Sequence, residues 1–427
     1  LDDAVATASI AVPAIGFAAA AVLFTVAPLL ADFYGRDEVQ PIAMVLSGVL
    51  FIQSLSIVPD ALIQRRMDFK WRRGVVDPLS VIVYGSVVIA LALLGAEEWA
   101  LVAGQYALFT TITIGAILIA RPNPFRGTAS IGMWRKMARY GRPLLGANVL
   151  EVIDQQVEPV ALGRNVSATA VGLYNVGFRL ALLPLSGITY IAAQVLFPAL
   201  TRVKNDSKRF REALLEVVGL LPLFSIPACI TLAGLGEPAV VTLFGERWRE
   251  AGVVLQILVL WTLGLSVSEL GREIFKAAGR TGMVARNAGL EAATLIVFVA
   301  ALWIFGQVGL VTVALGRLAV GIVAVTAAAQ ALVNVVDVTL GELWRQVRPA
   351  VVGGAMQWVA LFALAQIALE GFEGWTHLGD VNLGPVIPLA MLGGLTAVGL
   401  AVFAAGAEIT KRGVIGGAIT SIRSAMG

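Results

Sequence analysis

Residues 8–31 read ASIAVPAIGFAAAAVLFTVAPLLA and contain no Asp, Glu, Lys, Arg or His. A helix of about 20 apolar residues crosses the roughly 30 Å hydrocarbon core of a bilayer. The stretch therefore predicts a membrane-spanning helix. Its two prolines, Pro13 and Pro28, do not argue against this, because packed membrane helices tolerate proline.

Further stretches along the whole chain are also long and apolar enough to cross a bilayer. The predicted spans are 8–31, 41–63, 76–94, 99–120, 142–162, 169–199, 214–236, 251–271, 285–305, 308–335, 350–369 and 382–405. Only 14% of all residues are charged and 58% are hydrophobic, against about 25% charged in soluble domains. The sequence therefore predicts an all-α polytopic membrane protein of about twelve transmembrane helices.

The basic residues alternate between the predicted loops. Loops at 64–74, 121–141, 201–212 and 272–284 are rich in Lys and Arg, whereas 95–98 and 370–381 have none. Because cytoplasmic loops carry the excess of Lys and Arg, we predict an even number of spans in the cytoplasmic membrane and a cytoplasmic C-terminus. The formal charge of +3 is spread over these short loops, so no nucleic-acid partner is expected.

The spans fall into groups along the chain. The predicted division is an N-terminal group at 1–120, a cytoplasmic basic loop at 121–141, six spans at 142–335, and two final helices with a tail at 336–427. The chain begins Leu1-Asp2-Asp3 without methionine. We therefore expect a preceding segment.

Polar residues form a stripe on the predicted span 142–162. Asn148, Glu151, Gln155 and Glu158 follow helical spacing, and Asp154 falls beside them. Charged groups inside a membrane usually face a cavity or a partner. The stripe favours the wall of a water-filled cavity. The alternatives are a helix lying flat at the interface and a structural ion-pair network.

Two arginines, Arg179 and Arg317, lie inside predicted spans. A guanidinium holds phosphate oxygens through parallel hydrogen bonds, and Asn175 stands one helical turn before Arg179. The other reading is that each arginine neutralises a buried carboxylate, either Glu158 or Glu269. The residues alone leave both readings open.

No catalytic or cofactor-binding arrangement is evident. The single histidine, His377, is far in sequence from the single cysteine, Cys229, and the phosphate-loop pattern GxxxxGK[ST] is absent. We therefore expect a protein that is not an enzyme and that needs no cofactor or metal.

Five segments, in matching order and spacing, carry a family resemblance. They are ALIQRRMDFK at 61–70, YGRPLLGAN at 140–148, GR at 163–164 with AVGLYN at 170–175, FPAL at 197–200, and LFGERW at 243–248 with LQIL at 255–258. Together they resemble the polysaccharide-transport (Wzx-like) branch of the multidrug/oligosaccharidyl-lipid/polysaccharide exporter superfamily. This branch contains lipid-linked oligosaccharide flippases.

The resemblance implies fourteen helices in the full chain, two of them before Leu1. It implies two six-helix lobes in a V, followed by a final helix pair. The implied cargo is a polyprenyl-diphosphate-linked oligosaccharide, moved by cation-coupled alternating access, with lipids and pathway glycosyltransferases or a polymerase as partners. Candidate residues for the diphosphate and sugar are Arg179, Arg317, Asn148, Gln155 and Asn175, and for the coupling cation Glu151, Asp154, Glu158 and Glu269.

Three alternatives remain at this stage. A lipid II flippase and a multidrug/cation antiporter belong to the same superfamily. A membrane polysaccharide polymerase or ligase belongs to another class, and its usual long external loop is missing between the predicted spans.

The predicted topology can be tested by labelling introduced cysteines. Asp206→Cys and His377→Cys should react with membrane-impermeant maleimide from opposite sides of the membrane, because an odd number of spans separates their loops. Labelling of both positions from the outside would overturn the span count.

Overall fold

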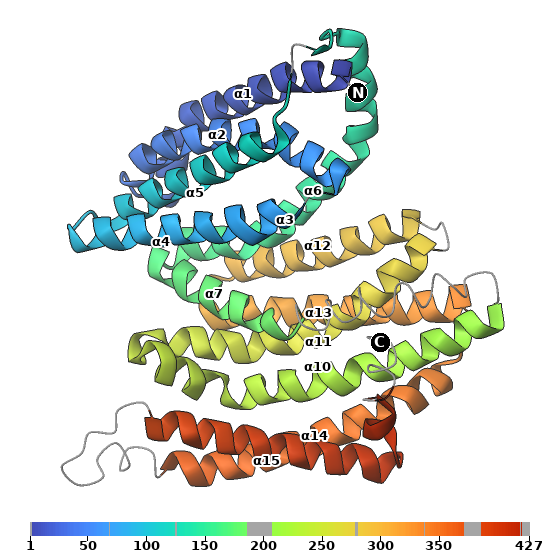
Figure 1. Ribbon diagram of the computed structural model, residues 1–427. Coiled ribbons are helices and arrows are strands. Elements are labelled where there is room, and N and C mark those ends of the chain that lie inside the picture. Colours follow the sequence, from blue (N-terminus) through green and yellow to red (C-terminus); the bar gives the residue numbers. More distant parts are fainter. Residues whose placement is uncertain are drawn as a thin grey trace. The chain divides into compact units, whose positions relative to one another are not determined.

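The structure of the chain is a computed structural model. It describes residues 2–67, 69–123, 126–185, 207–277, 281–336, 338–370, 386–418 and 420. All regular elements in these ranges are helical (Figure 1). They are α1 (Asp2–Tyr34), α2 (Val39–Arg66), α3 (Phe69–Trp71), η1 (Arg72–Val76), α4 (Asp77–Leu93), α5 (Glu97–Ala120), α6 (Ile131–Asn165), α7 (Ala168–Ala181), α10 (Ser207–Phe244), η4 (Glu246–Trp248), α11 (Arg249–Ala277), α12 (Thr281–Ile304), α13 (Leu310–Val336), α14 (Leu340–Glu370) and α15 (Val386–Thr410).

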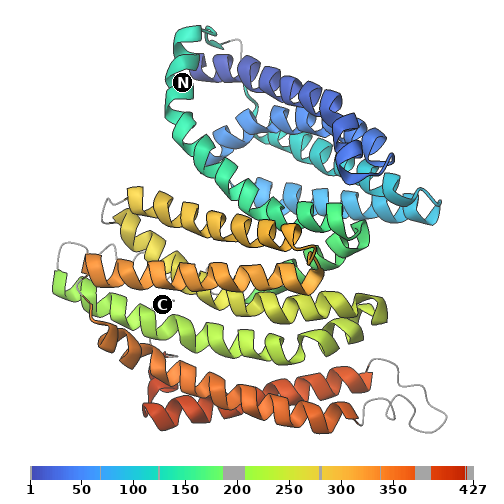
Figure 2. The same ribbon diagram turned by 180° about the vertical axis from the view of Figure 1, so that it is seen from behind.

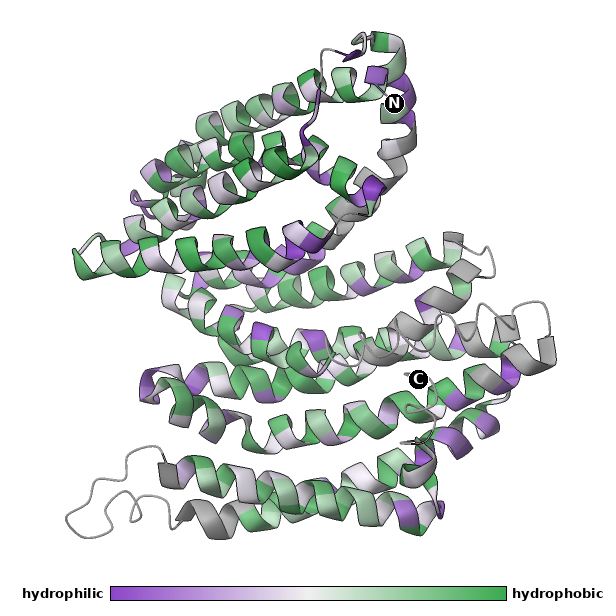
Figure 3. Ribbon diagram, viewed as in Figure 1, coloured by the Kyte–Doolittle hydropathy of each residue, from purple (hydrophilic) through white to green (hydrophobic). Residues whose placement is uncertain are grey.

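Within these ranges, 11 helices are long and apolar enough to cross a membrane. Most residues of these helices are hydrophobic, and polar residues gather toward their ends (Figure 3). The prediction of an all-helical polytopic membrane protein is confirmed. The predicted span 142–162 lies within α6, which is not one of the 11 helices. The labelling positions Asp206 and His377 lie outside the described residues.

Several helices begin earlier than predicted from their apolar stretches, among them α14, which begins at Leu340 instead of 350. α6 begins at Ile131 instead of 142, and α10 begins at Ser207 instead of 214. Residues 131–141 of the expected basic loop are thus helical. Basic residues favour helix as well as loop, so a loss of apolar character marks the end of a span without marking the end of its helix.

The chain forms two compact units, Leu1–Asn148 and Val149–Gly427. In the first unit, α2 packs between α1 and α5, and α4 packs on α5. Their shared core contains Ile63 and Ala116. Arg66 Nη1 donates to the carbonyl oxygen of Ala120 at 2.8 Å, which satisfies an end carbonyl of α5.

An ion-pair cluster joins α2, η1 and α4 of the first unit. Arg72 Nε donates to Asp60 Oδ1 at 2.8 Å, and Arg72 also pairs with Asp77. Both acids belong to spanning helices that flank the basic segment. The cluster therefore fixes how this segment turns from α2 into α4.

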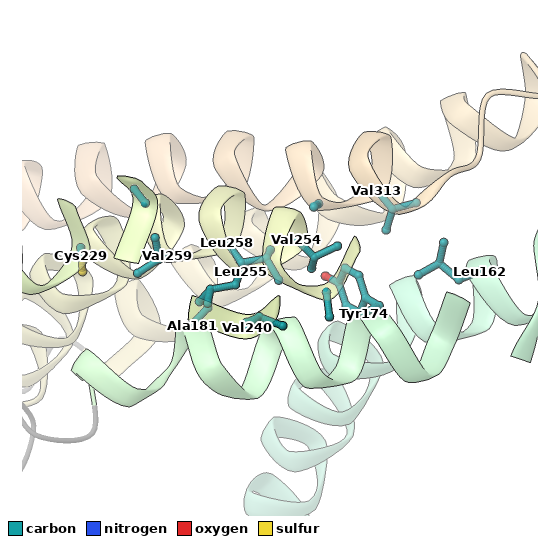
Figure 4. Packing of buried hydrophobic residues seen from close by; sticks show 13 residues of the cluster. Leu162, Tyr174, Ala181, Cys229, Val240, Val254, Leu255, Leu258, Val259 and Val313 are labelled. Atoms are coloured by element: carbon teal, nitrogen blue, oxygen red, sulfur yellow. The ribbon is translucent and has the colours of Figure 1, made fainter. Parts of the chain in front are cut away.

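The second unit is built around α10, α11 and α13. α11 packs against α7, α10 and α13, and their buried side chains, including Tyr174, Val254 and Leu258, form one cluster (Figure 4). α6 reaches this unit through Ala161, which packs with Leu295 of α12.

Small residues allow close helix contacts in this unit. A Cβ added to Gly177 on α7 would lie 2.7 Å from the Ala251 carbonyl oxygen of α11, and one added to Gly264 would lie 2.9 Å from the Gly321 carbonyl oxygen of α13. Close backbone approach is how membrane helices gain van der Waals contact without a hydrophobic driving force.

The final helices α14 and α15 pack on α10 within the same unit (Figure 2). Arg211 of α10 pairs with Glu342 of α14 at 2.7 Å. The fully buried Gln357 of α14 donates through Nε2 to the Pro227 carbonyl oxygen at 3.1 Å and to Thr231 Oγ1 at 2.9 Å. The separate grouping of 336–427 remains a prediction.

Gly177→Val should destabilise the second unit by about 1–3 kcal/mol, because the new side chain would overlap α11. Gly172→Val on the same helix is the matched control, since a Cβ there meets no heavy atom within 4 Å. Chemical unfolding in detergent measures both variants. Equal stability of the two would show that close packing of α7 on α11 is not required.

Candidate functional site

The most deeply buried charges in the described part of the chain meet where α6 and α13 face each other. Arg317 of α13 is 1% exposed and Glu158 of α6 is 0% exposed. Arg317 Nη2 donates to Glu158 Oε2 at 2.8 Å, and Nε donates to Glu158 Oε1. Nη1 donates to Asp154 Oδ2 at 2.7 Å, and Nη2 also donates to the Asp154 carbonyl oxygen at 2.7 Å.

Helical spacing places the two acids for this arrangement. Asp154 and Glu158 stand four residues apart on α6, so they present carboxylates from successive turns of one face. The guanidinium offers five N–H donors in a rigid plane, and the four bonds to α6 use most of them. A side chain held in this way cannot take up a phosphate unless a carboxylate releases it.

Aromatic rings from two other helices cover the guanidinium. Arg317 Cζ lies 5.0 Å from the ring centre of Trp261 on α11 and 5.7 Å from that of Phe178 on α7. Phe178 stacks on Trp261 with centres 5.6 Å apart, and Tyr174 continues the row. Cation–π attraction within about 6 Å adds to the ion pairs. The ion pairs and the aromatic rings together therefore join α6, α7, α11 and α13 around the guanidinium.

Asp154, Glu158 and Arg317 are called the cluster from here on, and its two carboxylates differ in exposure. Its formal charge with all groups ionised is one negative, from two carboxylates and one guanidinium. Glu158 is enclosed, whereas the side chain of Asp154 is 28% exposed. Asp154 Oδ1 is a buried atom without a hydrogen-bond partner among the described residues. Asp154 is therefore the residue of the cluster with an acceptor left over for a proton, a water or a ligand.

Pairing with Glu158 or Glu269 is one of the two predictions for the intramembrane arginines. Arg317 pairs with Glu158, and Asp154 is a second partner. Close ion pairing explains why Glu158 faces the second unit's interior. A cation-binding role for either carboxylate stays a prediction.

Arg179 has a different environment. It is exposed on α7, as is Asn175 one turn earlier, and it forms no ion pair with the part of the chain that the structure describes. Gln155 of α6 is also exposed. The side chains of Asn148, Glu151 and Glu269 lie outside the described residues, so their predicted roles stay predictions.

The aromatic rings over Arg317 could not be predicted from the sequence. Tyr174 and Phe178 stand four residues apart on α7, which places them on one face, but nothing in the sequence relates that face to Trp261. In the described ranges, no group of three His, Cys, Asp or Glu side chains is placed to hold a metal ion.

Known proteins resemble this chain in sequence and in fold. Residues 3–253 match the family described as "Polysaccharide biosynthesis protein". The chain belongs to this family. The resemblance inferred from the five segments is therefore confirmed.

Curated relatives include other polysaccharide biosynthesis proteins. The teichuronic acid biosynthesis protein TuaB of Bacillus subtilis is 24% identical over 240 residues, which are 56% of this chain and 49% of TuaB. The succinoglycan biosynthesis transport protein ExoT of Rhizobium meliloti is 27% identical over 238 residues, 56% of this chain and 48% of ExoT. The lipopolysaccharide biosynthesis protein WzxC of Escherichia coli is 22% identical over 314 residues, 72% of this chain and 62% of WzxC. The aligned region spans about half the length of the first two.

A solved structure shares the fold of this family member. The lipid II flippase MurJ in an inward closed conformation aligns with a TM-score of 0.70 and 16% sequence identity. The alignment covers 97% of this chain and 85% of MurJ. At this identity the likeness shows the fold alone.

Arg317→Ala should destabilise the protein by roughly 3–5 kcal/mol, because it leaves Glu158 charged and enclosed without a partner. Arg179→Ala should change stability by less than about 0.5 kcal/mol, as expected of an exposed side chain. Unfolding in detergent compares the two. The double variant Arg317→Met/Glu158→Leu should recover most of the loss, and a single Arg317→Ala variant as stable as the parent would contradict the ion pair's role.

Proposed function

We propose that this protein moves a polyprenyl-diphosphate-linked oligosaccharide across the cytoplasmic membrane for the synthesis of a surface glycan. Membership of the polysaccharide biosynthesis family and the similarity to ExoT, a transport protein by name, support this proposal. The fold shared with a flippase supports it as well. The partners would be the lipid-linked oligosaccharide, membrane lipid, and the glycosyltransferases or polymerase of the same pathway.

The observation that carries the proposal is the contrast between the two intramembrane arginines. Arg317 is enclosed and bound to two carboxylates, whereas Arg179 is exposed and unpaired among the described residues. A diphosphate crossing a low-dielectric region needs a cationic partner with free donors. Arg179 meets this need, and Asn175 beside it supplies an amide for a sugar hydroxyl.

The Asp154–Glu158–Arg317 cluster would serve the coupling step of this transport. Addition of a proton or a cation at the partly exposed Asp154 would weaken its bond to Arg317 and loosen α6 from α13. Loss of the proton or cation would restore the bond. A two-state element of this kind is what a coupling ion must bias during alternating access.

The alternatives predict different cargo. A lipid II flippase would carry one defined lipid-linked precursor, and a multidrug/cation antiporter would carry amphiphilic drugs. The family description and the names of TuaB, ExoT and WzxC favour a polysaccharide precursor over both. The same comparisons give no support to a polymerase or ligase.

Export tests the proposal in a bacterial strain that lacks its own oligosaccharide flippase. The full-length protein should restore surface glycan and lower the pool of lipid-linked oligosaccharide on the inner face. Arg179→Ala should lower export by about tenfold or more, since a charge-assisted contact contributes about 1.5–3 kcal/mol, and Arg179→Lys should keep part of the activity.

Arg247→Ala is the matched control, because Arg247 is an exposed arginine of η4 between two spanning helices. It should leave export unchanged. Full export by a folded Arg179→Ala variant would remove Arg179 from the site. Drug efflux without glycan export by the unchanged protein would reject the proposed cargo.

A further inference from the structure

An open groove of about 380 Å³ lies within the first unit, between the start of α1 and the start of α6. Four residues on one face of α1, namely Thr7, Ile10, Ala11 and Ile15, form one wall. Ile131 and Trp134 of α6 line the other side. A volume of this size falls in the range of small-molecule sites, and its lining is mostly apolar.

Hydrogen bonds fix the segment that closes one end of this groove. Asp3 Oδ1 accepts from the backbone N–H of Thr128 at 2.8 Å. Thr7 Oγ1 accepts from the backbone N–H of Ser130 at 3.2 Å. Both bonds join α1 to the residues just before α6, so the two walls are held together by the fold.

The first half of α6 crosses the end of α1 instead of running beside it (Figures 1 and 2). With α1 crossing the membrane, as its length and apolar character allow, this part of α6 would run roughly along the membrane surface. Met137 packs on the core of the first unit. Apolar residues on one side of such a helix and basic residues on another are typical of interfacial helices.

Two arginines of α6, Arg135 and Arg139, follow the groove residues on the same face of the helix and form a basic strip. Ile131, Trp134, Arg135 and Arg139 follow an i, i+3, i+4, i+8 pattern and share one face. Both arginines are exposed. Arg139 lies about 12 Å along the axis from Ile131, at 1.5 Å per residue. Lys136 is equally exposed but lies off this face.

We propose that this groove holds an acyl chain of an anionic phospholipid, whose phosphate lies against Arg135 and Arg139. An apolar groove alone would accept the acyl chain of any lipid. The adjacent positive strip selects a negative headgroup, because basic residues at the membrane surface attract anionic lipids. Trp134 lies between the groove and the basic strip, and tryptophan is enriched at membrane interfaces.

Quenching by brominated lipids tests this site in the full chain. The protein contains nine tryptophans, so the signal of Trp134 is the difference between the unchanged protein and Trp134→Phe. This difference should be quenched more strongly by phosphatidylglycerol with brominated acyl chains than by the matching phosphatidylcholine, at equal content in nanodiscs.

The charge variants give the decisive comparison. Arg135→Gln/Arg139→Gln should weaken the apparent affinity for brominated phosphatidylglycerol by about tenfold or more, whereas Lys136→Gln should leave it close to the original value. Ala11→Phe, which fills the groove, should reduce quenching by both lipids while the unfolding temperature stays unchanged.

Three results would overturn the proposal. Equal quenching by the two lipids would show that the headgroup is not selected. Loss of the preference in Lys136→Gln as well would reduce it to general surface charge. Absence of quenching by either lipid would show that the groove is covered, for example by another segment of the full-length chain.

Discussion

A guanidinium enclosed between packed membrane helices needs acceptors within hydrogen-bond distance, and this requirement organises the second unit around Arg317. Arg317 meets it with four bonds to two residues of α6. Those bonds fix the register of α6 against α13 more narrowly than apolar contact would, since lipid competes equally for apolar surface. The aromatic row on α7 and α11 then encloses the guanidinium from the other side.

The surrounding helices supply the close packing that the ion pairs need. Gly316 precedes Arg317, and a Cβ there would lie 2.8 Å from the Phe298 ring of α12. Gly177 and Gly264 allow a similarly close approach of a neighbouring helix. Small residues therefore bring α7, α11, α12 and α13 near enough for one arginine to contact side chains from several helices. Charge pairing and close packing thus depend on each other in this unit.

Much of the fold could be predicted because lipid imposes a length and a polarity on each span. The apolar run at 8–31 is part of α1, and the family that the five segments indicate is confirmed by the family match. Helix ends were less predictable, since residues 131–141 lost apolar character without losing helical structure. The basic strip beside the groove was therefore taken for a loop.

The candidate site could be predicted only in part. Spacing along α6 placed Asp154 and Glu158 on one face, and the isolation of Arg317 in an apolar stretch indicated a partner. Which acid it meets depends on tertiary packing, because Glu158 and Glu269 were equally plausible on charge alone. Trp261 and Phe178 could not be connected to Arg317 for the same reason: they belong to separate helices.

The buried amide of Gln357 gives the final helix pair a defined position along α10. The Pro227 carbonyl oxygen accepts bonds from Thr231 Oγ1 and from Gln357 Nε2. If α14 slid by one helical turn, the amide would lose both bonds and face hydrocarbon. Apolar surfaces in lipid are nearly interchangeable, but this contact has a single satisfactory alignment, so α14 and α15 should follow α10 as one body whenever α10 moves.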